Sequence, residues 1–334
     1  MKLEAASWIC PKEDMGSVCP VFWKEFSCPK PVIKAEMWLT ALGVYEARLN
    51  GQRVGDYVLA PGWTAYEKRL QYQQYDITKL LQENNSITVT VGRGWMRSRI
   101  GAGDIEGRMR QPCGILGAIH ILYYDGSEDI LHTDSSWVCA ESGTRFSEIY
   151  DGEIHDATFE PENWQSVRVL SWPKEILIPQ EGDEIHEMER VSAKSVIITP
   201  RGETVVDFGQ EVTGYVEFTV EAKGQEQIRI QHGEVLDKDG NFYNENYRSA
   251  KSEIRYTCKE GIQTWHPTLT FFGFRYIKIE GLAEMPKPEQ FTAIVVYSNI
   301  RQTGTLNCSN SKLNQLFSNI FWGQKGNFLD VPTD

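Results

Sequence analysis

The sequence predicts a mostly β chain in which two β-sandwiches in series are followed by one helix. Residues 216–221 alternate apolar and polar side chains, which is the period of a strand with one buried face. Asn50-Gly51 lies between two strand-like runs and strongly indicates a two-residue hairpin turn. Helical spacing of apolar residues appears at length only near the C-terminus. A long helix is therefore expected only in the last part of the chain.

Length and composition fit a folded protein with about two domains and a further fragment. The chain has 334 residues, of which 41% are hydrophobic and 24% charged, as in ordinary globular proteins. Acidic residues outnumber basic ones by 46 to 34, so we expect no nucleic-acid partner. No apolar run could span a bilayer and no signal-peptide pattern opens the chain. We therefore expect no membrane partner and a cytoplasmic protein.

The seven cysteines indicate reduced, mostly buried thiols. Their number is odd and no C-x-x-C pair occurs. Cys10, Cys19 and Cys28 are evenly spaced, but the steps are too long for the usual pairs of metal ligands and no histidine lies nearby. We expect no metal site and no cofactor.

Residues 1–32 are expected to form an extended lead-in with a first strand at 22–26, because four prolines exclude a long helix. The first sandwich is expected over residues 33–178. Its predicted elements are a hairpin at 44–54, a helical turn at 77–81 capped by Asp76, and strands at 87–91, 119–123, 130–132, 167–170 and 175–178. Residues 97–112 are rich in Gly and Arg and are expected to form a long surface loop.

A linker is expected over residues 179–194, where the composition shifts to Glu and Pro. The second sandwich is expected over residues 195–300. After the strand at 216–221, Lys223-Gly224 supplies a turn into a strand at 227–231. Residues 271–279 are apolar enough to predict a strand that is covered on both faces.

Residues 301–334 change to a helical pattern. Ser309 or Asn310 can cap a helix, and Gly323 and Gly326 are expected to weaken it. Its apolar stripe consists of Leu313, Leu316, Phe317, Ile320 and Phe321. A single amphipathic helix has nothing of its own kind to pack against, so we expect the chain to stop inside a third, helical domain.

Three long segments in the second predicted sandwich carry a resemblance to a known family. They are DFGQEVTGYVEF at 207–218, GEVLDKDGNFYNENYRSA at 233–250 and WHPTLTFFGFRYIKIEG at 265–281. Together they resemble the β-sandwich that directly precedes the catalytic domain of bacterial α-L-rhamnosidases. TALGVYEARLNGQRVGD at 40–56, LAPGWTAYEKRLQYQQYDIT at 59–78 and SEIYDGEIHDA at 147–157 are similar to the N-terminal sandwich of that family, which is of the galactose-binding-like, jelly-roll kind.

The C-terminal NFLDVPTD resembles the opening of the family's catalytic domain, an (α/α)6 barrel. The resemblance implies a glycoside hydrolase that removes terminal α-L-rhamnose from a rhamnose-containing glycoside with inversion, using two carboxyl groups roughly 6.5–9.5 Å apart. It aligns Asp334 with an aspartate that holds the sugar hydroxyls. The family's general acid and base fall beyond Asp334, so we expect no catalytic residue in this chain and no activity from it alone.

Other candidate residues have a structural interpretation beside the functional one. Trp63, Trp95 and Trp265 could stack on a sugar, although sandwich cores also use tryptophan; Trp95 is the predicted sugar contact because its Gly and Arg neighbours suggest an exposed loop. His232 and His266 lie in strand patterns and are expected to be structural. The five arginines Arg93, Arg97, Arg99, Arg108 and Arg110 are expected to be solvated.

Two alternatives stay open from the sequence. The chain could be a non-catalytic carbohydrate-binding or scaffolding protein that ends near Asp334, in which case a homodimer would cover the apolar stripe. It could also belong to a different exo-glycosidase with similar accessory domains, since a fold does not fix a chemistry.

Overall fold

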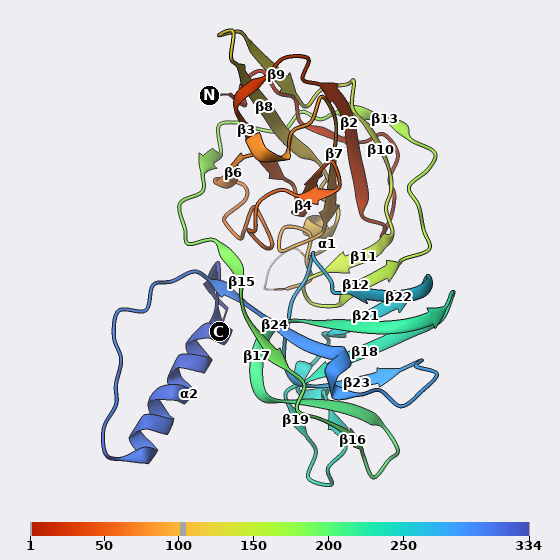
Figure 1. The fold of residues 1–334 in the computed structure, drawn as a ribbon, viewed down its shortest axis with the longest axis vertical. Coiled ribbons are helices and arrows are strands. Elements are labelled where there is room, and N and C mark those ends of the chain that lie inside the picture. The colour runs from red at the N-terminus through yellow and green to blue at the C-terminus, as the bar shows by residue number, and fades with distance from the viewer. Residues whose placement is uncertain (1, 101–104, 334) are drawn as a thin grey trace. The chain divides into compact units, whose positions relative to one another are not determined.

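The computed structural model describes residues 2–100 and 105–333. The chain forms two compact units, Met1–Glu181 and Gly182–Asp334, each of which is described by itself. Figure 1 shows strands throughout both units and one long helix near the C-terminus. The predicted mostly β fold is confirmed. Neither α-helix of the described part is long and apolar enough to cross a lipid bilayer.

One curled sheet makes up most of the first unit. Its order among the described residues is β14-β6-β3-β8-β1-β13-β10-β2-β7-β4-β5, with β9 paired to β8. These strands are β1 (Ile9–Pro11), β2 (Pro20–Ser27), β3 (Val32–Ala41), β4 (Val44–Leu49), β5 (Gln52–Arg53), β6 (Leu70–Asp76), β7 (Asn84–Gly92), β8 (Ile115–Tyr123), β9 (Glu128–His132), β10 (Val138–Glu141), β13 (Gln165–Val169) and β14 (Leu177–Pro179). The hairpin of β11 (Thr144–Glu148) and β12 (Gly152–Asp156), the turn η1 (Thr78–Leu80) and the short helix α1 (Ile105–Met109) complete the unit.

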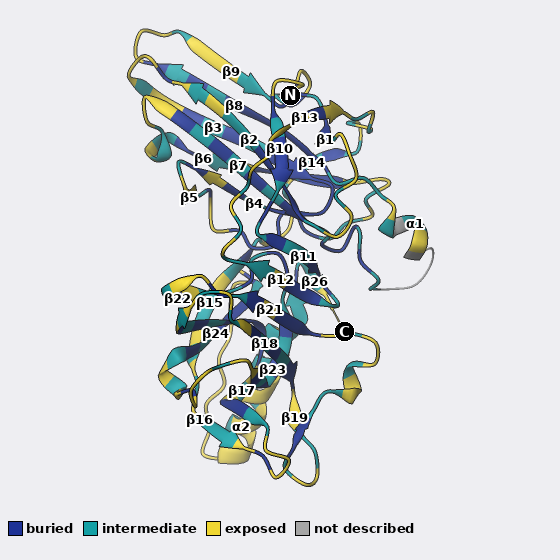
Figure 2. Cartoon of the chain, turned by 90° about the vertical axis from the view of Figure 1, so that its right-hand side faces the viewer, coloured by how far each residue is buried: buried dark blue, intermediate teal, exposed yellow. Residues whose placement is uncertain are grey.

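The sheet folds over itself into two layers because β13 pairs with β1 on one side and β10 on the other. The layers face each other across apolar side chains: Ile87 of β7 lines the same small internal space as Met37 of β3 and Ile119 of β8. All three residues are at most 2% exposed. The alternating burial along the strands, visible as alternating colours in Figure 2, is the pattern that the sequence predicts for a sandwich.

The Asn50-Gly51 turn joins β4 to β5 as predicted. Both residues have positive φ, 54° and 78°, which is the conformation that a tight hairpin turn requires and that Asn and Gly tolerate. The Asn50 side chain accepts from the amide of Ser86 at 3.0 Å and donates to Leu80 O at 2.9 Å. The turn is therefore tied to the neighbouring strand as well.

The N-terminal residues are more than an extended lead-in. Leu3, Ala6 and Trp8 are at most 1% exposed and join an apolar cluster with Leu70 and Leu116. Lys174 donates to Glu4 O at 2.8 Å, which holds this segment in place. The first residues thus contribute to the core of the first unit.

The predicted surface loop at 97–112 is wrong in part. Ser98 is fully buried, and helix α1 lies within the segment. The organising group is Glu148, which is 1% exposed and accepts from the amides of Arg99, Tyr150 and Asp151 at 3.0, 2.8 and 2.7 Å. A buried carboxylate with several donors orders the nearby backbone, and sequence periodicity does not reveal such a contact. The Gly101-Ala102-Gly103 stretch lies outside the described residues.

The second unit is built on a sheet in which β21-β18-β23-β17-β24-β15 are neighbours and β16 and β22 also pair with β17. The strands are β15 (Ile185–Ser192), β16 (Ser195–Ile198), β17 (Thr204–Lys223), β18 (Gln227–Gly233), β21 (Glu253–Thr257), β22 (Glu260–Trp265), β23 (Phe272–Glu280) and β24 (Phe291–Ser298). Short elements are the pair β19 (Val235–Leu236) and β20 (Phe242–Tyr243), and the turns η2 (Glu245–Tyr247) and η3 (Pro288–Gln290).

The long strand β17 contains the alternation that the sequence shows. Val216, Phe218 and Val220 are at most 4% exposed, whereas Glu217 and Thr219 are partly exposed. Gly214 lets this strand approach β24, because a Cβ there would lie 1.8 Å from Ile294 O. Only glycine fits at this position.

Two predictions for the second unit need correction. Residues 185–192, which the sequence assigns to the linker 179–194, form β15 and pair with β24. Acidic residues and flanking Pro and Gly hide the strand pattern there. Residues 272–280 are not covered on both faces, because buried residues alternate with partly exposed ones such as Arg275 and Lys278.

Helix α2 (Ser311–Asn327) is capped by Asn310, whose side chain accepts from the amide of Lys312 at 3.0 Å, as predicted. The helix continues through Gly323 and Gly326, the two residues expected to weaken it, and ends at Asn327. It contains no buried residue, and Figure 2 shows it largely exposed. Leu313, Leu316 and Ile320 are 48%, 53% and 58% exposed, so the apolar stripe is open in this unit.

Candidate functional site

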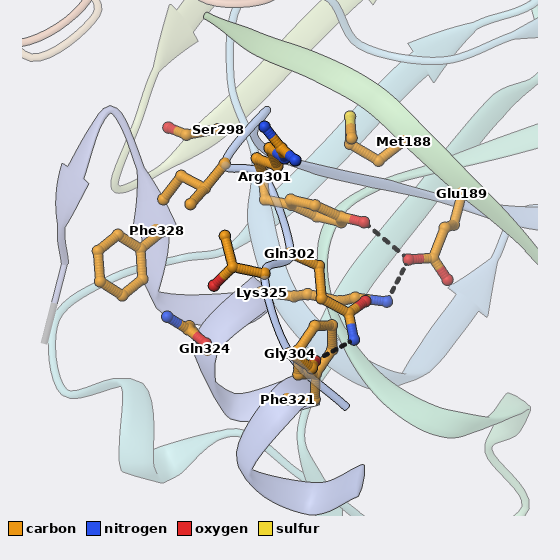
Figure 3. A pocket seen from close by; sticks show the side chains of 13 residues that line it. Met188, Glu189, Ser298, Arg301, Gln302, Gly304, Phe321, Gln324, Lys325 and Phe328 are labelled. Atoms are coloured by element: carbon orange, nitrogen blue, oxygen red, sulfur yellow. Dashed lines mark hydrogen bonds and ion pairs between the residues drawn. The ribbon is translucent and has the colours of Figure 1, made fainter. Parts of the chain in front are cut away.

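A pocket of about 610 Å³ lies in the second unit at the C-terminal end of α2. Its walls come from β15, from β24 with the following segment 300–304, and from the last turns of the helix. Figure 3 shows Glu189 and Lys325 pointing toward each other across it, with Phe321 and Phe328 on the helix side. The pocket therefore lies where the sheet meets the residues that precede Asp334.

Glu189 is the charged centre of this pocket. The Lys325 ammonium forms an ion pair with Glu189 Oε1, and Tyr297 Oη donates to the same oxygen at 2.8 Å. Burial opposes ionisation of Glu189, but the hydrogen bonds from Lys325 and Tyr297 hold its pKa below the ordinary value. Burial, reinforced by the Glu189 carboxylate, raises the pKa of Tyr297. Glu189 is thus ionised and Tyr297 neutral near pH 7.

Aromatic side chains surround the Lys325 ammonium. It lies 4.5 Å from the ring centre of Trp322, 5.5 Å from Phe321 and 5.6 Å from Tyr297. The negative faces of these rings stabilise the cation in addition to the carboxylate. Neither Glu189, Tyr297 nor Lys325 was identified from the sequence, since Glu189 falls in the predicted linker and nothing in the local pattern connects the three.

The pocket by itself does not have the groups for glycoside hydrolysis. Glu189 is the one carboxylate among the described residues that line it, and its Oε1 is engaged by Lys325 and Tyr297. Inverting hydrolysis needs two carboxyl groups, one protonated and one ionised. The arrangement suits a structural junction better than a reaction centre.

Two further carboxylates lie close together in the same unit, Glu211 on β17 and Glu234 near β23. A Cβ on Gly273 would lie 4.0 Å from Oε1 of both Glu211 and Glu234, so these two oxygens are no more than about 8 Å apart. A distance up to this limit is compatible with the separation of the two carboxyl groups in inverting hydrolases, roughly 6.5–9.5 Å. Both side chains are exposed, however, and Asn246 donates to Glu234 Oε2 at 2.8 Å. Exposed acidic pairs are common, and substitutions of this pair are used below as a test.

The predicted substrate ligand Asp334 lies outside the described residues. The residues before it form a tight hairpin of β25 (Phe328–Leu329) and β26 (Val331–Pro332), with Asp330 in the turn at φ 67°. Asp330 therefore lies in a turn and not in a helix. The role of Asp334 stays a prediction.

Trp95 was predicted to contact a sugar because an exposed loop was expected around it, and this expectation of exposure is wrong. Trp95 is 2% exposed and stacks on Trp63 with ring centres 6.0 Å apart. A ring buried in this way has no free face for a sugar, so the structural interpretation holds in this unit. Trp265 packs against Phe218 and Tyr256 at 5.8 and 4.8 Å and is also a packing residue.

Both histidines are structural, as predicted. His232 is fully buried and stacks on Phe272 with ring centres 3.7 Å apart. Burial lowers its pKa to about 3, and its Nδ1 lies 2.8 Å from Ser252 O. His266 stacks on Tyr215 at 5.0 Å.

The arginines are less solvated than predicted. Arg99 forms an ion pair with Asp151, and Arg93 lies 5.1 Å from the ring centre of Phe146. Burial lowers the pKa of Arg93. Arg110 pairs with Glu106 at 2.7 Å and is exposed, as expected. The seven cysteines are free thiols, and five of them are buried, as predicted.

Three family models match the chain in succession. Residues 30–189 match the α-L-rhamnosidase N-terminal domain, and residues 197–297 match the bacterial α-L-rhamnosidase concanavalin-like domain. Residues 301–334 match the bacterial α-L-rhamnosidase six-hairpin glycosidase domain. The last match contains α2 and the β25-β26 hairpin.

Similar proteins carry the same description. An α-L-rhamnosidase of Formosa agariphila is 34% identical over 326 residues, which cover 93% of this chain and 35% of that protein. An α-L-rhamnosidase of Streptomyces avermitilis is 35% identical, and the match covers 93% of this chain and 31% of that protein. The crystal structure of an Aspergillus terreus α-L-rhamnosidase matches with a TM-score of 0.91 at 36% identity, over 99% of this chain and 41% of that one. This chain thus spans about a third of the length of the curated relatives it matches.

Proposed function

The chain belongs to the bacterial α-L-rhamnosidase family, and we propose that it supplies the accessory sandwiches and first catalytic-domain helix of an enzyme that hydrolyses terminal α-L-rhamnose from glycosides. The observation that supports this proposal most is the match of residues 301–334 to the six-hairpin glycosidase domain. These residues include a helix whose apolar stripe is open, as the first helix of a larger helical domain would be.

In this proposal the chemistry needs groups outside the chain. Inversion uses a general acid at the leaving oxygen and a general base that activates water on the opposite face of the sugar. The carboxylate in the pocket is already engaged by Lys325 and Tyr297, so it is poorly placed for either role. The six-hairpin domain would supply both groups, and Asp334 would hold the sugar hydroxyls. A structure of the Streptomyces avermitilis relative in complex with L-rhamnose supports rhamnose as the sugar.

The activity of the isolated chain tests this proposal. We expect no turnover of an aryl α-L-rhamnoside by the 334-residue chain, whereas the protein that continues into the six-hairpin domain hydrolyses it. Release of the aryl group gives the readout, and NMR of the released sugar shows the inverted anomer. The proposal fails if the longer protein has no activity on this substrate.

Turnover by the 334-residue chain would also contradict the proposal. In that case, Glu211→Gln and Glu234→Gln variants would show whether the exposed acidic pair carries it. Glu217→Gln is the matched control, because Glu217 lies on the same strand as Glu211 and forms an ion pair with the surface residue Arg190.

The non-catalytic alternative keeps one supporting observation. The stripe Leu313, Leu316 and Ile320 would also be covered if two copies of this chain associated through α2. The match of the same helix to a glycosidase domain favours the enzyme. A homodimer and a cytoplasmic location stay predictions; the seven free thiols support a reducing compartment.

A further inference from the structure

Helix α2 is attached to the sheet of the second unit at its C-terminal end. Leu313, Leu316 and Ile320 in its first three turns are about half exposed, and Figure 1 shows this part of the helix standing away from the sheet. The preceding residues 299–310 are exposed as well. The contacts with the sheet begin in the last turns, where Lys325 reaches Glu189.

Three different strands of the sheet hold the segment 325–330. Glu189 of β15 pairs with Lys325, and Thr213 of β17 donates from Oγ1 to Gly326 O at 2.8 Å. Ser298 of β24 accepts at Oγ from the amide of Asp330 at 2.8 Å. Leu329, between these contacts, is fully buried. Fixing a short segment from three strands leaves it little freedom.

Gly326 is part of this attachment. A Cβ at this position would lie 3.2 Å from Thr213 Oγ1, which is tighter than an ordinary contact. The glycine that the sequence suggests as a helix-weakening residue therefore lets the helix backbone approach β17. The hydrogen bond from Thr213 also pairs one of the last carbonyls of the helix, which lack partners within it.

We propose that the Glu189–Tyr297–Lys325 cluster is a positioning device, through which the second sandwich sets the place of the hairpin that leads to Asp334, the predicted sugar ligand. Tyr297 holds the Glu189 carboxylate, Glu189 holds Lys325, and Lys325 fixes the last turn of α2 five residues before the hairpin turn at Asp330. In this proposal the three residues act on the position of the hairpin and not on the sugar directly. This inference rests on the proposed function for its catalytic consequence, but not for the attachment of the helix.

The attachment can be tested on the 334-residue chain. Glu189→Gln keeps the size of the side chain and the hydrogen bond from Tyr297 but removes the charge, and Lys325→Met keeps the apolar stem. In both variants we expect amide hydrogen exchange of residues 323–331 to become at least about tenfold faster, because a charged partner is left unpaired in a partly buried site. Exchange in β17 and β24 should not change, which shows that the sheet remains folded.

Two controls show whether faster exchange is specific to this cluster or follows from the loss of any charge on the sheet. Glu217→Gln breaks the exposed Arg190–Glu217 pair on the same sheet and is expected to leave exchange of residues 323–331 unchanged. Lys325→Arg keeps the positive charge and is expected to retain most of the protection. Unchanged exchange in both Glu189→Gln and Lys325→Met would overturn the proposal.

The catalytic consequence is tested in the protein that continues into the six-hairpin domain. Lys325→Met is expected to raise KM for an aryl α-L-rhamnoside by about tenfold, because a displaced sugar ligand weakens ground-state binding, and Lys325→Arg to restore it. Faster exchange with unchanged KM and kcat would overturn the positioning role and leave a purely structural attachment. An inactive wild-type protein would overturn the proposed function, whereas the exchange result would still decide whether the helix is held by this cluster.

Discussion

Replacing Trp95 with alanine is expected to destabilise the first unit by about 3–5 kcal/mol, the usual cost of removing a large buried aromatic side chain. Trp95 is 2% exposed and stacks on Trp63, so its removal leaves a cavity that the neighbouring strands cannot fill. Hydrogen exchange resolved by peptide, which separates residues 2–181 from 182–333, measures the loss. The second unit should keep its protection.

The matched control is Trp164→Ala. Trp164 is 37% exposed and touches Trp23 with ring centres 5.3 Å apart, so its removal should cost clearly less than that of Trp95. If the Trp95→Ala variant kept its stability but lost affinity for L-rhamnose, the structural interpretation would be wrong and the original prediction of a sugar contact would stand.

The second unit is expected to lose stability in mild acid because of His232. Burial lowers the pKa of His232 to about 3 in the folded protein, whereas the unfolded chain takes up a proton near pH 6.5. The stabilisation is therefore complete above pH 6.5 and falls steadily as the pH drops toward 3. At pH 4 the loss amounts to about 3 kcal/mol, at about 1.4 kcal/mol per pH unit.

His232→Phe is the variant that tests this expectation. It keeps an aromatic ring stacked on Phe272, and Ser252 O keeps the hydrogen bond from the backbone amide of residue 232 at 3.1 Å. Urea unfolding at pH 8 and pH 4 should show a smaller acid loss in the variant than in the wild type. An identical loss in both proteins would mean that another group controls the acid sensitivity.

Several strands of both sandwiches could be predicted because they have one buried and one wetter face. Val216, Phe218 and Val220 show this pattern, and the Asn50-Gly51 turn could be identified because few residue pairs tolerate two positive φ angles. The strand β15 was missed because only Ile185 is buried in it and charged residues follow, including Glu189, which lines the pocket.

The candidate site could not be predicted for a different reason. Glu189, Tyr297 and Lys325 lie far apart in the sequence and meet only through strand pairing and the placement of α2. Trp95 was misjudged because its Gly and Arg neighbours are typical of exposed loops, whereas Glu148 orders the backbone that follows it. Such long-range polar contacts leave no periodic pattern in a single sequence.

The central claim is that α2 begins a helical domain whose other helices cover its apolar stripe. Leu316 is 53% exposed in the second unit and is therefore a suitable reporter. The decisive measurement is the rate at which a thiol reagent modifies a Leu316→Cys variant, in the 334-residue chain and in the protein that continues into the six-hairpin domain. Tyr124→Cys, at a position that is 73% exposed in the first unit, is the control. We expect modification at position 316 to be at least about tenfold slower in the longer protein, because a covered side chain reacts only after local opening, with no change at position 124. Equal rates at position 316 in the two proteins would show that the stripe stays open and would contradict the claim.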